Sequence, residues 1–307
     1  MTVATSPRPR GTGPVRLPNQ RLSGRLWIAF GRALGGLAWL LRIRRRVVLE
    51  NLARAFPSLD EAARRTLARS SYASLGTGLG EILLSRTISD GELADWVSFD
   101  GFERYEQAAA EGHGVVVVIA HFGNWELLGR ACAKRGVQLA TITRKMNGWA
   151  NRRIAAARAG SGLAQLPDRG ATADALALLR RNGVLAIAVD QNMREKRGIF
   201  VDFFSHPACT TPAAAVYALR AGAPIIAAFP VRQPDGSHRV LVQGPFVAPP
   251  ELRGHAAIQA LTQELTRAVE AIVRAHPEQW YWLHRRWKTQ PRAPVKAQTD
   301  QLARRTE

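Results

Sequence analysis

An unbroken run of β-branched residues in the middle of the chain, residues 115–119, constrains the fold more than any other feature. A run of this length without polar alternation is typical of a strand that is buried on both faces of a parallel sheet. Apolar runs predict further strands at 137–143, 184–189, 224–232 and 239–243. Helical apolar periods predict helices at 59–83, 102–111, 171–182, 212–221 and 256–275. Strands that alternate with helices predict an α/β fold, a sheet flanked by helices.

The most apolar stretch lies near the N-terminus, at residues 27–41. It is shorter than the roughly 18 residues expected of a spanning helix, and Arg32 and two glycines interrupt it. Arginines on both sides of the stretch favour a helix in the membrane interface, with guanidinium groups on lipid phosphates. A buried core helix with a charged end is the alternative.

These patterns divide the chain into four parts. We expect a disordered basic tail at 1–25, a membrane-associating helix at 26–46, one globular domain at 47–292 and a flexible tail at 293–307.

The net charge is the unusual feature of the composition. The chain has 43 Lys and Arg against 24 Asp and Glu, a formal charge of +19. Such a charge indicates an anionic partner, which is a nucleic acid, an anionic lipid surface or an acidic protein. The 2 cysteines exclude a disulfide framework and a cysteine-only zinc site. The sequence has no Gly-rich nucleotide loop, no serine-nucleophile elbow and no metal-binding histidine spacing.

A polar motif follows the central run directly, at residues 121–126. Gly123 lets the backbone reverse, and Asn124 is a suitable N-cap for a helix that begins near Trp125. Residues five apart within one helix lie about 140° apart, so His121 and Glu126 meet only if His121 lies in the turn before the helix. A carboxylate on one imidazole nitrogen raises the basicity of the other. His121, oriented by Glu126, is therefore a candidate general base that deprotonates a bound hydroxyl for attack on an activated carbonyl. A locally hydrogen-bonded histidine beside an ordinary first-turn glutamate is the alternative.

Residues 121–126 resemble the His-x4-Asp/Glu motif of the lysophospholipid and glycerolipid acyltransferases. They resemble most the form found in the late acyltransferases of lipid A biosynthesis, the lauroyl/myristoyl type. Further blocks are similar to that family in the same order: 45–52 with 55–57, Arg144, 189–191 with Gly198, Phe203, Phe204 and Thr211, and 277–288. The resemblance covers residues 25 to 291.

The resemblance implies transfer of a fatty acyl chain from a thioester to a hydroxyl of a lipid A precursor or similar glycolipid. The implied donor is acyl carrier protein rather than coenzyme A, and no metal or other cofactor is implied. It also implies a glycerolipid-acyltransferase-like sheet and an enzyme at the cytoplasmic face of the inner membrane.

Two departures from the family pattern leave the acceptor open. Ser205 and His206 follow the Phe pair where the family usually has glycine, and residues 145–148 lack the common Pro-rich form. The alternative acceptor is a lysophospholipid or a phosphatidylinositol mannoside. The non-enzyme alternative is a basic nucleic-acid-binding protein, but the sequence has no recognisable reading motif, and we expect no nucleic-acid partner.

Several basic and polar residues are candidates for substrate contact. Arg144, Asp190 and Gln191 follow predicted strands, so they are expected at the same sheet edge as His121. Arg144 is a candidate to bind a phosphate or to orient the Glu126 carboxylate, and Asp190 to orient Arg144 or the acceptor. The basic run Arg194, Lys196 and Arg197 is a candidate contact for lipid phosphate or the acidic carrier protein. The alternatives are that Arg144 is an ordinary surface arginine, that Asp190 caps a turn, and that the basic run is a solvated loop.

The C-terminal block mixes aromatic residues with cations. The residues are Trp280, Tyr281, Trp282, Arg285, Arg286, Trp287 and Lys288. Such a mixture suits a membrane interface, where indole rings lie near headgroups, and it equally suits core packing of the aromatic rings.

Overall fold

The computed structural model describes residues 16–137, 139–143, 164–167 and 170–291. Within these residues the central sheet has seven strands in the order β1-β9-β8-β2-β5-β3-β4. The strands are β1 Val97–Asp100, β2 Val115–Ile119, β3 Leu139–Thr143, β4 Ala164–Pro167, β5 Val184–Ala188, β8 Ile225–Arg232 and β9 His238–Phe246. All neighbouring strands run parallel except β8 and β9, which are antiparallel. The predicted α/β fold is therefore confirmed, whereas the β6–β7 hairpin, Ile199–Phe203 and His206–Thr210, was not predicted.

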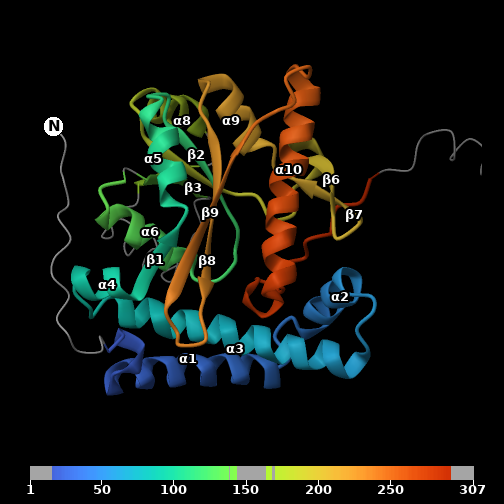
Figure 1. The fold of residues 1–307 in the computed structure, drawn as a ribbon. Coiled ribbons are helices and arrows are strands. Elements are labelled where there is room, and N and C mark those ends of the chain that lie inside the picture. The colour runs from blue at the N-terminus through green and yellow to red at the C-terminus, as the bar shows by residue number, and fades with distance from the viewer. Residues whose placement is uncertain (1–15, 138, 144–163, 168–169, 292–307) are drawn as a thin grey trace, which may run out of the picture.

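Helices cover both faces of the sheet (Figure 1). They are α4 Asp90–Trp96, α5 Phe102–Ala110, α6 Trp125–Lys134, α8 Ala171–Arg180, α9 Ala213–Ala221 and α10 Gly254–Ala275. Val116 and Val118 of β2 belong to the core under α8, α9 and α10, and Val115 and Val117 belong to the core under α4, α5 and α6. Because successive strand residues point to opposite faces, a strand between two cores must be apolar throughout, as the central run is.

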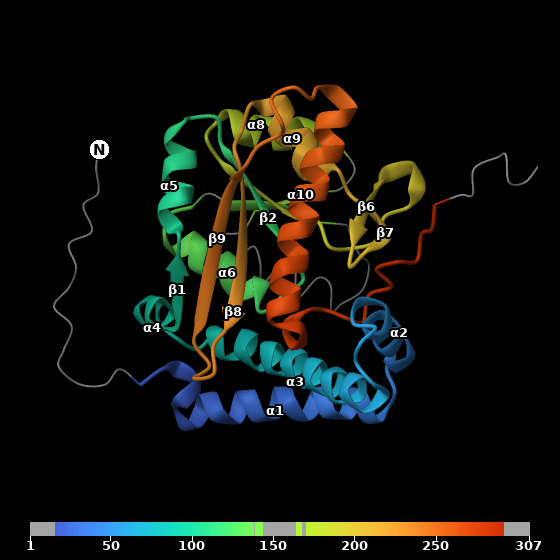
Figure 2. The same ribbon diagram turned by 45° about the vertical axis from the view of Figure 1, so that its right-hand side comes forward.

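Two long helices, α1 Leu22–Leu40 and α3 Glu61–Ser85, lie side by side across one end of the sheet (Figure 2). Glycines let their backbones approach closely. A Cβ added to Gly31 would lie 2.1 Å from the carbonyl oxygen of Gly76, and one added to Gly35 would lie 2.2 Å from that of Tyr72. The glycine that interrupts the apolar stretch of the sequence at position 35 is thus part of a helix–helix contact.

The N-terminal boundaries differ from those predicted. A 3-10 turn, Pro18–Gln20, and the first turn of α1 fall within the part assigned to a tail, because Gly24 packs against this turn. The segment predicted as one helix over 26–46 instead bends by 91° between α1 and α2, Arg45–Ala55. Arg42 and Arg44, with φ of 57° and 53°, form the bend.

The side of α1 that faces away from α3 is apolar and exposed. We call this surface the α1 outer face. Its exposed large apolar residues are Leu22, Leu26, Trp27, Phe30, Leu34, Leu37 and Leu40. Over the described part of the chain, no helix by itself combines the length and apolar character needed to cross a membrane; only α1 and α2 taken together do, despite their bend.

Candidate functional site

The turn that carries His121 connects β2 to α6. Gly123 has a φ of +56°, and a Cβ there would lie 1.8 Å from the carbonyl oxygen of Pro230. Only glycine therefore fits this position. The Asn124 side chain accepts a hydrogen bond from the Leu127 N–H at 3.1 Å and caps α6. The predicted glycine turn and N-cap are both confirmed.

A buried charge cluster connects this turn to α3, β8 and β9. The Asn124 amide donates to Glu81 at 3.0 Å, and the Arg232 guanidinium donates to the same carboxylate at 2.9 Å. His238 Nε2 lies 3.2 Å from the other Glu81 oxygen. Burial alone would raise the pKa of Glu81, but His238 and Arg232 together lower it to about 2. Asn124 is thus a structural link between α3 and α6.

The His121 ring is hydrogen-bonded to the carboxylate of Asp190. His121 Nδ1 lies 2.8 Å from Asp190 Oδ1, and the His121 backbone N–H donates to Asp190 Oδ2 at 2.8 Å. The indole N–H of Trp280 donates to the same oxygen at 2.8 Å. Asp190 follows β5, which pairs in parallel with β2, so the two strand ends lie side by side.

The environment of Asp190 keeps it ionised. Burial favours the neutral acid, but the charge of His121 and the hydrogen bonds from His121 and Trp280 outweigh it and lower the pKa of Asp190 to about 2. An ionised carboxylate accepts the Nδ1 proton, so Nε2 is the basic nitrogen of the ring. Gln191 Nε2 lies 3.1 Å from that nitrogen, as an amide donor would.

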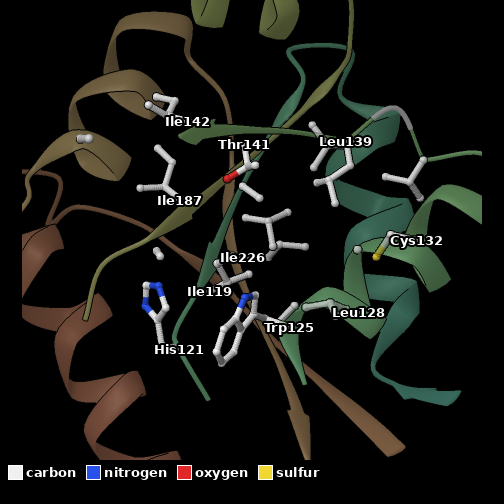
Figure 3. Close-up of a pocket in the computed structure, with 18 of the residues that line it drawn as sticks. Ile119, His121, Trp125, Leu128, Cys132, Leu139, Thr141, Ile142, Ile187 and Ile226 are labelled. Carbon is white, nitrogen blue, oxygen red and sulfur yellow. The ribbon is translucent and has the colours of Figure 1, made fainter. Parts of the chain in front are cut away.

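A cavity of about 610 Å³ opens beside His121 and runs between the sheet and α6 (Figure 3). Its walls are mainly apolar. Trp125, Leu128 and Cys132 line it from one face of α6, and Cys132 lies about 10 Å further along the helix than Trp125. A hydrocarbon chain suits a cavity of this shape and lining.

Glu126 lines the same cavity as His121. Its carboxylate accepts a hydrogen bond from the Trp125 indole at 3.0 Å. The orienting role that the sequence assigns to Glu126 stays a prediction.

The remaining predicted residues are distributed around this site. Arg197 lines the cavity, and Arg194 is exposed at the start of a 3-10 turn, Glu195–Arg197. Arg144 lies outside the described residues.

The C-terminal block packs its tryptophans inside the protein and leaves Arg285 and Lys288 exposed. Trp280, Trp282 and Trp287 are buried, so a membrane-interface role for these three rings is wrong. The Tyr281 N–H donates to the His121 carbonyl at 2.9 Å. The contact of Trp280 with Asp190 was missed, because no local signal connects residues 90 positions apart.

Two more residues of this block fix the loop after β5. Arg286 is fully buried and donates to the carbonyls of Gln191 at 3.4 Å and Cys209 at 3.1 Å. Burial lowers the pKa of Arg286 to about 10. His284 Nε2 accepts the Asn192 N–H at 2.8 Å, and burial lowers the pKa of this histidine to about 4, so the ring is neutral.

Residues 25–289 match the family described as bacterial lipid A biosynthesis acyltransferase. The chain belongs to this family. The resemblance inferred from the motifs is thereby confirmed, and the protein is an acyltransferase.

Curated relatives carry related names. The chain is 28% identical over 263 residues to a lipid A biosynthesis lauroyltransferase of Escherichia coli (strain K12), covering 85% of each chain. It is 26% identical over 268 residues to a lipid A biosynthesis palmitoleoyltransferase of the same strain, covering 85% of this chain and 84% of the relative. It is also 25% identical over 245 residues to a phosphatidylinositol mannoside acyltransferase of Mycobacterium tuberculosis (strain ATCC 25618 / H37Rv), covering 78% of this chain and 75% of the relative.

Proposed function

We propose that this acyltransferase moves a fatty acyl chain from acyl carrier protein to a hydroxyl of a lipid A precursor or similar glycolipid, at the cytoplasmic face of the inner membrane. One observation carries the proposal. His121 is held by the buried Asp190 through Nδ1 and borders an apolar cavity of about 610 Å³.

The reaction needs one base and a thioester. The acceptor hydroxyl takes the position at Nε2 that the Gln191 amide occupies, and His121 removes its proton as the oxygen attacks the thioester carbonyl carbon. The resulting imidazolium is stabilised by the Asp190 carboxylate. Collapse of the tetrahedral intermediate breaks the carbon–sulfur bond, and the departing thiolate takes the proton from His121. Glu126, at the same cavity, is proposed to help orient this machinery.

The acceptor is proposed from the family and from the relatives. The two Escherichia coli relatives are named for lipid A biosynthesis, which supports a lipid A precursor. The mycobacterial relative is named for phosphatidylinositol mannoside, which keeps that glycolipid as the second candidate. Both are anionic lipids with hydroxyl groups.

Membrane association is supported by the α1 outer face. Phe30 and Leu40 are 50% and 73% exposed, which is costly in water and favourable in a lipid interface. Arg42 and Arg46 are exposed next to it, where they suit anionic headgroups. Anionic lipid and an acidic carrier protein together account for the charge of +19, which by itself would also suit nucleic acid.

The direct test is transfer by the purified full chain in mixed micelles. Labelled acyl carrier protein is offered with a lipid A precursor, a phosphatidylinositol mannoside or a lysophospholipid, and the labelled lipid is identified by mass spectrometry. We expect the label on the lipid A precursor. Label only on one of the other lipids would reassign the acceptor, and label on none of them would refute the proposal.

A further inference from the structure

A second apolar hollow shares Trp125 with the cavity in its lining. It has a volume of about 330 Å³ and lies between α1, α3 and the turn at residues 123–125. We call it the α1–α3 groove. Its large apolar lining residues are Leu34, Tyr72, Leu75, Leu79, Ile82, Trp125 and Leu283.

The polar groups in the lining already have partners within the protein. The Tyr72 hydroxyl donates to the Ile43 carbonyl, and the Asn124 side chain binds Glu81 and the Leu127 N–H. Gly35, Gly76 and Gly78 also line the groove and add no polar side chain to it. The groove therefore suits a hydrocarbon chain and offers little to a polar ligand.

Trp125 lines both the groove and the cavity. Its ring centroid lies 5.2 Å from that of His121. Two apolar sites thus meet at one side chain that contacts the candidate base. This arrangement fits a reaction whose two substrates each carry a hydrocarbon chain.

The location of the groove decides which substrate it takes. Leu34, Leu75 and Leu79 line it and are 37%, 38% and 41% exposed, so its rim continues the apolar surface of α1. A lipid acceptor reaches the enzyme from the bilayer, whereas a carrier protein brings its acyl chain from water. Arg44, which donates to the carbonyl of the groove residue Leu283 at 3.0 Å, places a cation near the groove for an anionic headgroup.

We propose that the α1–α3 groove binds a hydrocarbon chain of the acceptor lipid while the cavity beside α6 holds the chain being transferred. This inference rests on the proposed function, since it assumes a lipid acceptor.

Filling the groove tests the proposal. Leu79→Trp and, independently, Leu75→Trp put an indole into it from exposed positions of α3. The matched control is Leu40→Trp, an equally apolar position on α1 that does not line the groove. We expect the two groove variants to raise the KM for the lipid acceptor at least about tenfold, the loss that about two methylene contacts explain. The KM for acyl carrier protein should not change. The slow rate at which water hydrolyses the acyl thioester of that donor should not change either. A rise in the donor KM instead, or no change in either, would overturn the proposal.

A binding experiment separates this proposal from the proposed function, because it needs no turnover. A lipid A precursor with a diazirine in one acyl chain is photolysed with the wild-type chain, and the labelled peptides are mapped. We expect label on the segments around Leu34 and Leu79, competed by unlabelled precursor and lost in Leu79→Trp. Equal labelling by a diazirine phosphatidylglycerol, without competition by the precursor, would mean that the groove contacts only bulk lipid and would overturn the proposal.

Discussion

The α1 outer face and the C-terminal block at residues 277–288 look alike in sequence and are opposite in structure. Both combine large apolar side chains with several arginines, and both permit a membrane-interface or a core interpretation. In the structure Phe30 and Leu40 are 50% and 73% exposed, whereas Trp280 and Trp282 are 3% and 0% exposed.

The difference comes from where the polar groups find partners. In the C-terminal block the indole N–H groups of Trp280, Trp282 and Trp287 donate to Asp190, to the Pro277 carbonyl and to the Phe203 carbonyl. In α1 the backbone bonds are internal to the helix. The contact with α3 is made by glycines and by Trp39, which packs against Tyr72, so the other large apolar side chains remain exposed. Composition therefore does not distinguish the buried block from the exposed face. The distinguishing feature is that the polar N–H groups of the buried tryptophans have hydrogen-bond acceptors inside the protein.

The largest expected contrast between the two regions is in folding stability. Trp282→Ala should lower the free energy of unfolding by about 3 to 5 kcal/mol, because it leaves a cavity in the core. Leu37→Ala on the α1 outer face should change the free energy of unfolding by less than about 0.5 kcal/mol. Urea unfolding in detergent measures both, and similar losses for the two variants would abolish the contrast.

A second contrast lies within α3. Its glycines pack against α1, whereas its Glu81 binds Arg232 and His238 of the sheet. The folded pKa of Glu81, about 2, is below its ordinary value of 4.5, so the ionised carboxylate stabilises the fold above pH 4.5. That contribution, about 3 kcal/mol, should be lost as the pH falls from 4.5 towards 2. Urea midpoints measured across this range should depend on pH less in Glu81→Gln than in wild type. The exposed Glu61→Gln of the same helix is the control, and identical pH profiles for wild type and Glu81→Gln would disprove the assignment.

Charge reversal beside the α1 outer face tests its membrane role. Arg42→Glu with Arg46→Glu should weaken binding to anionic vesicles by about 1 kcal/mol per residue. Arg220→Glu, an exposed position on α9, should have little effect. Sedimentation with vesicles measures the partition coefficient. Equal losses per reversed residue at the α1–α2 pair and at Arg220 would show that net charge, not this face, determines binding.

The smallest expected effect concerns the exposed basic loop, which we assign to the donor and not to lipid. Neutralising Arg194, Lys196 and Arg197 should lower kcat/KM for acyl carrier protein several-fold at low salt and leave that for acyl-CoA nearly unchanged. The difference should shrink as salt rises, because the Debye length falls to about 8 Å at physiological ionic strength. Steady-state rates with both donors across salt measure this, and equal salt slopes would remove the steering argument.

Much of the fold could be predicted because the strands are buried on both faces. The run at 115–119 and the run at 184–189 stay apolar throughout, which marks them without reference to distant residues. The strand at β9 was predicted, but its antiparallel direction and the β6–β7 hairpin were not, because direction and pairing depend on partners that the local pattern does not contain.

The site was predictable only as far as it is local. His121, Gly123 and Asn124 follow from a strand, a turn and a helix start that adjoin in sequence. Asp190 comes to His121 through the β2–β5 pairing, and Trp280 comes to Asp190 through the C-terminal block. Asp190 lies 69 positions from His121 and 90 positions from Trp280 in the sequence. The sequence therefore pointed to the nearby Glu126 as the orienting carboxylate and assigned Asp190 to other partners.

The most direct test of the account is the turnover of His121→Ala, measured as kcat with acyl carrier protein and the lipid A precursor. Because general base catalysis contributes about 10²- to 10⁴-fold, we expect kcat to fall at least about 10²-fold. The kcat of Asp190→Asn should fall less, and its pH profile should shift, since this change removes the carboxylate charge that faces His121 Nδ1. Unchanged circular dichroism and urea midpoints would show that the fold survives. Near-full turnover by a well-folded His121→Ala would contradict the assignment of His121 as the base.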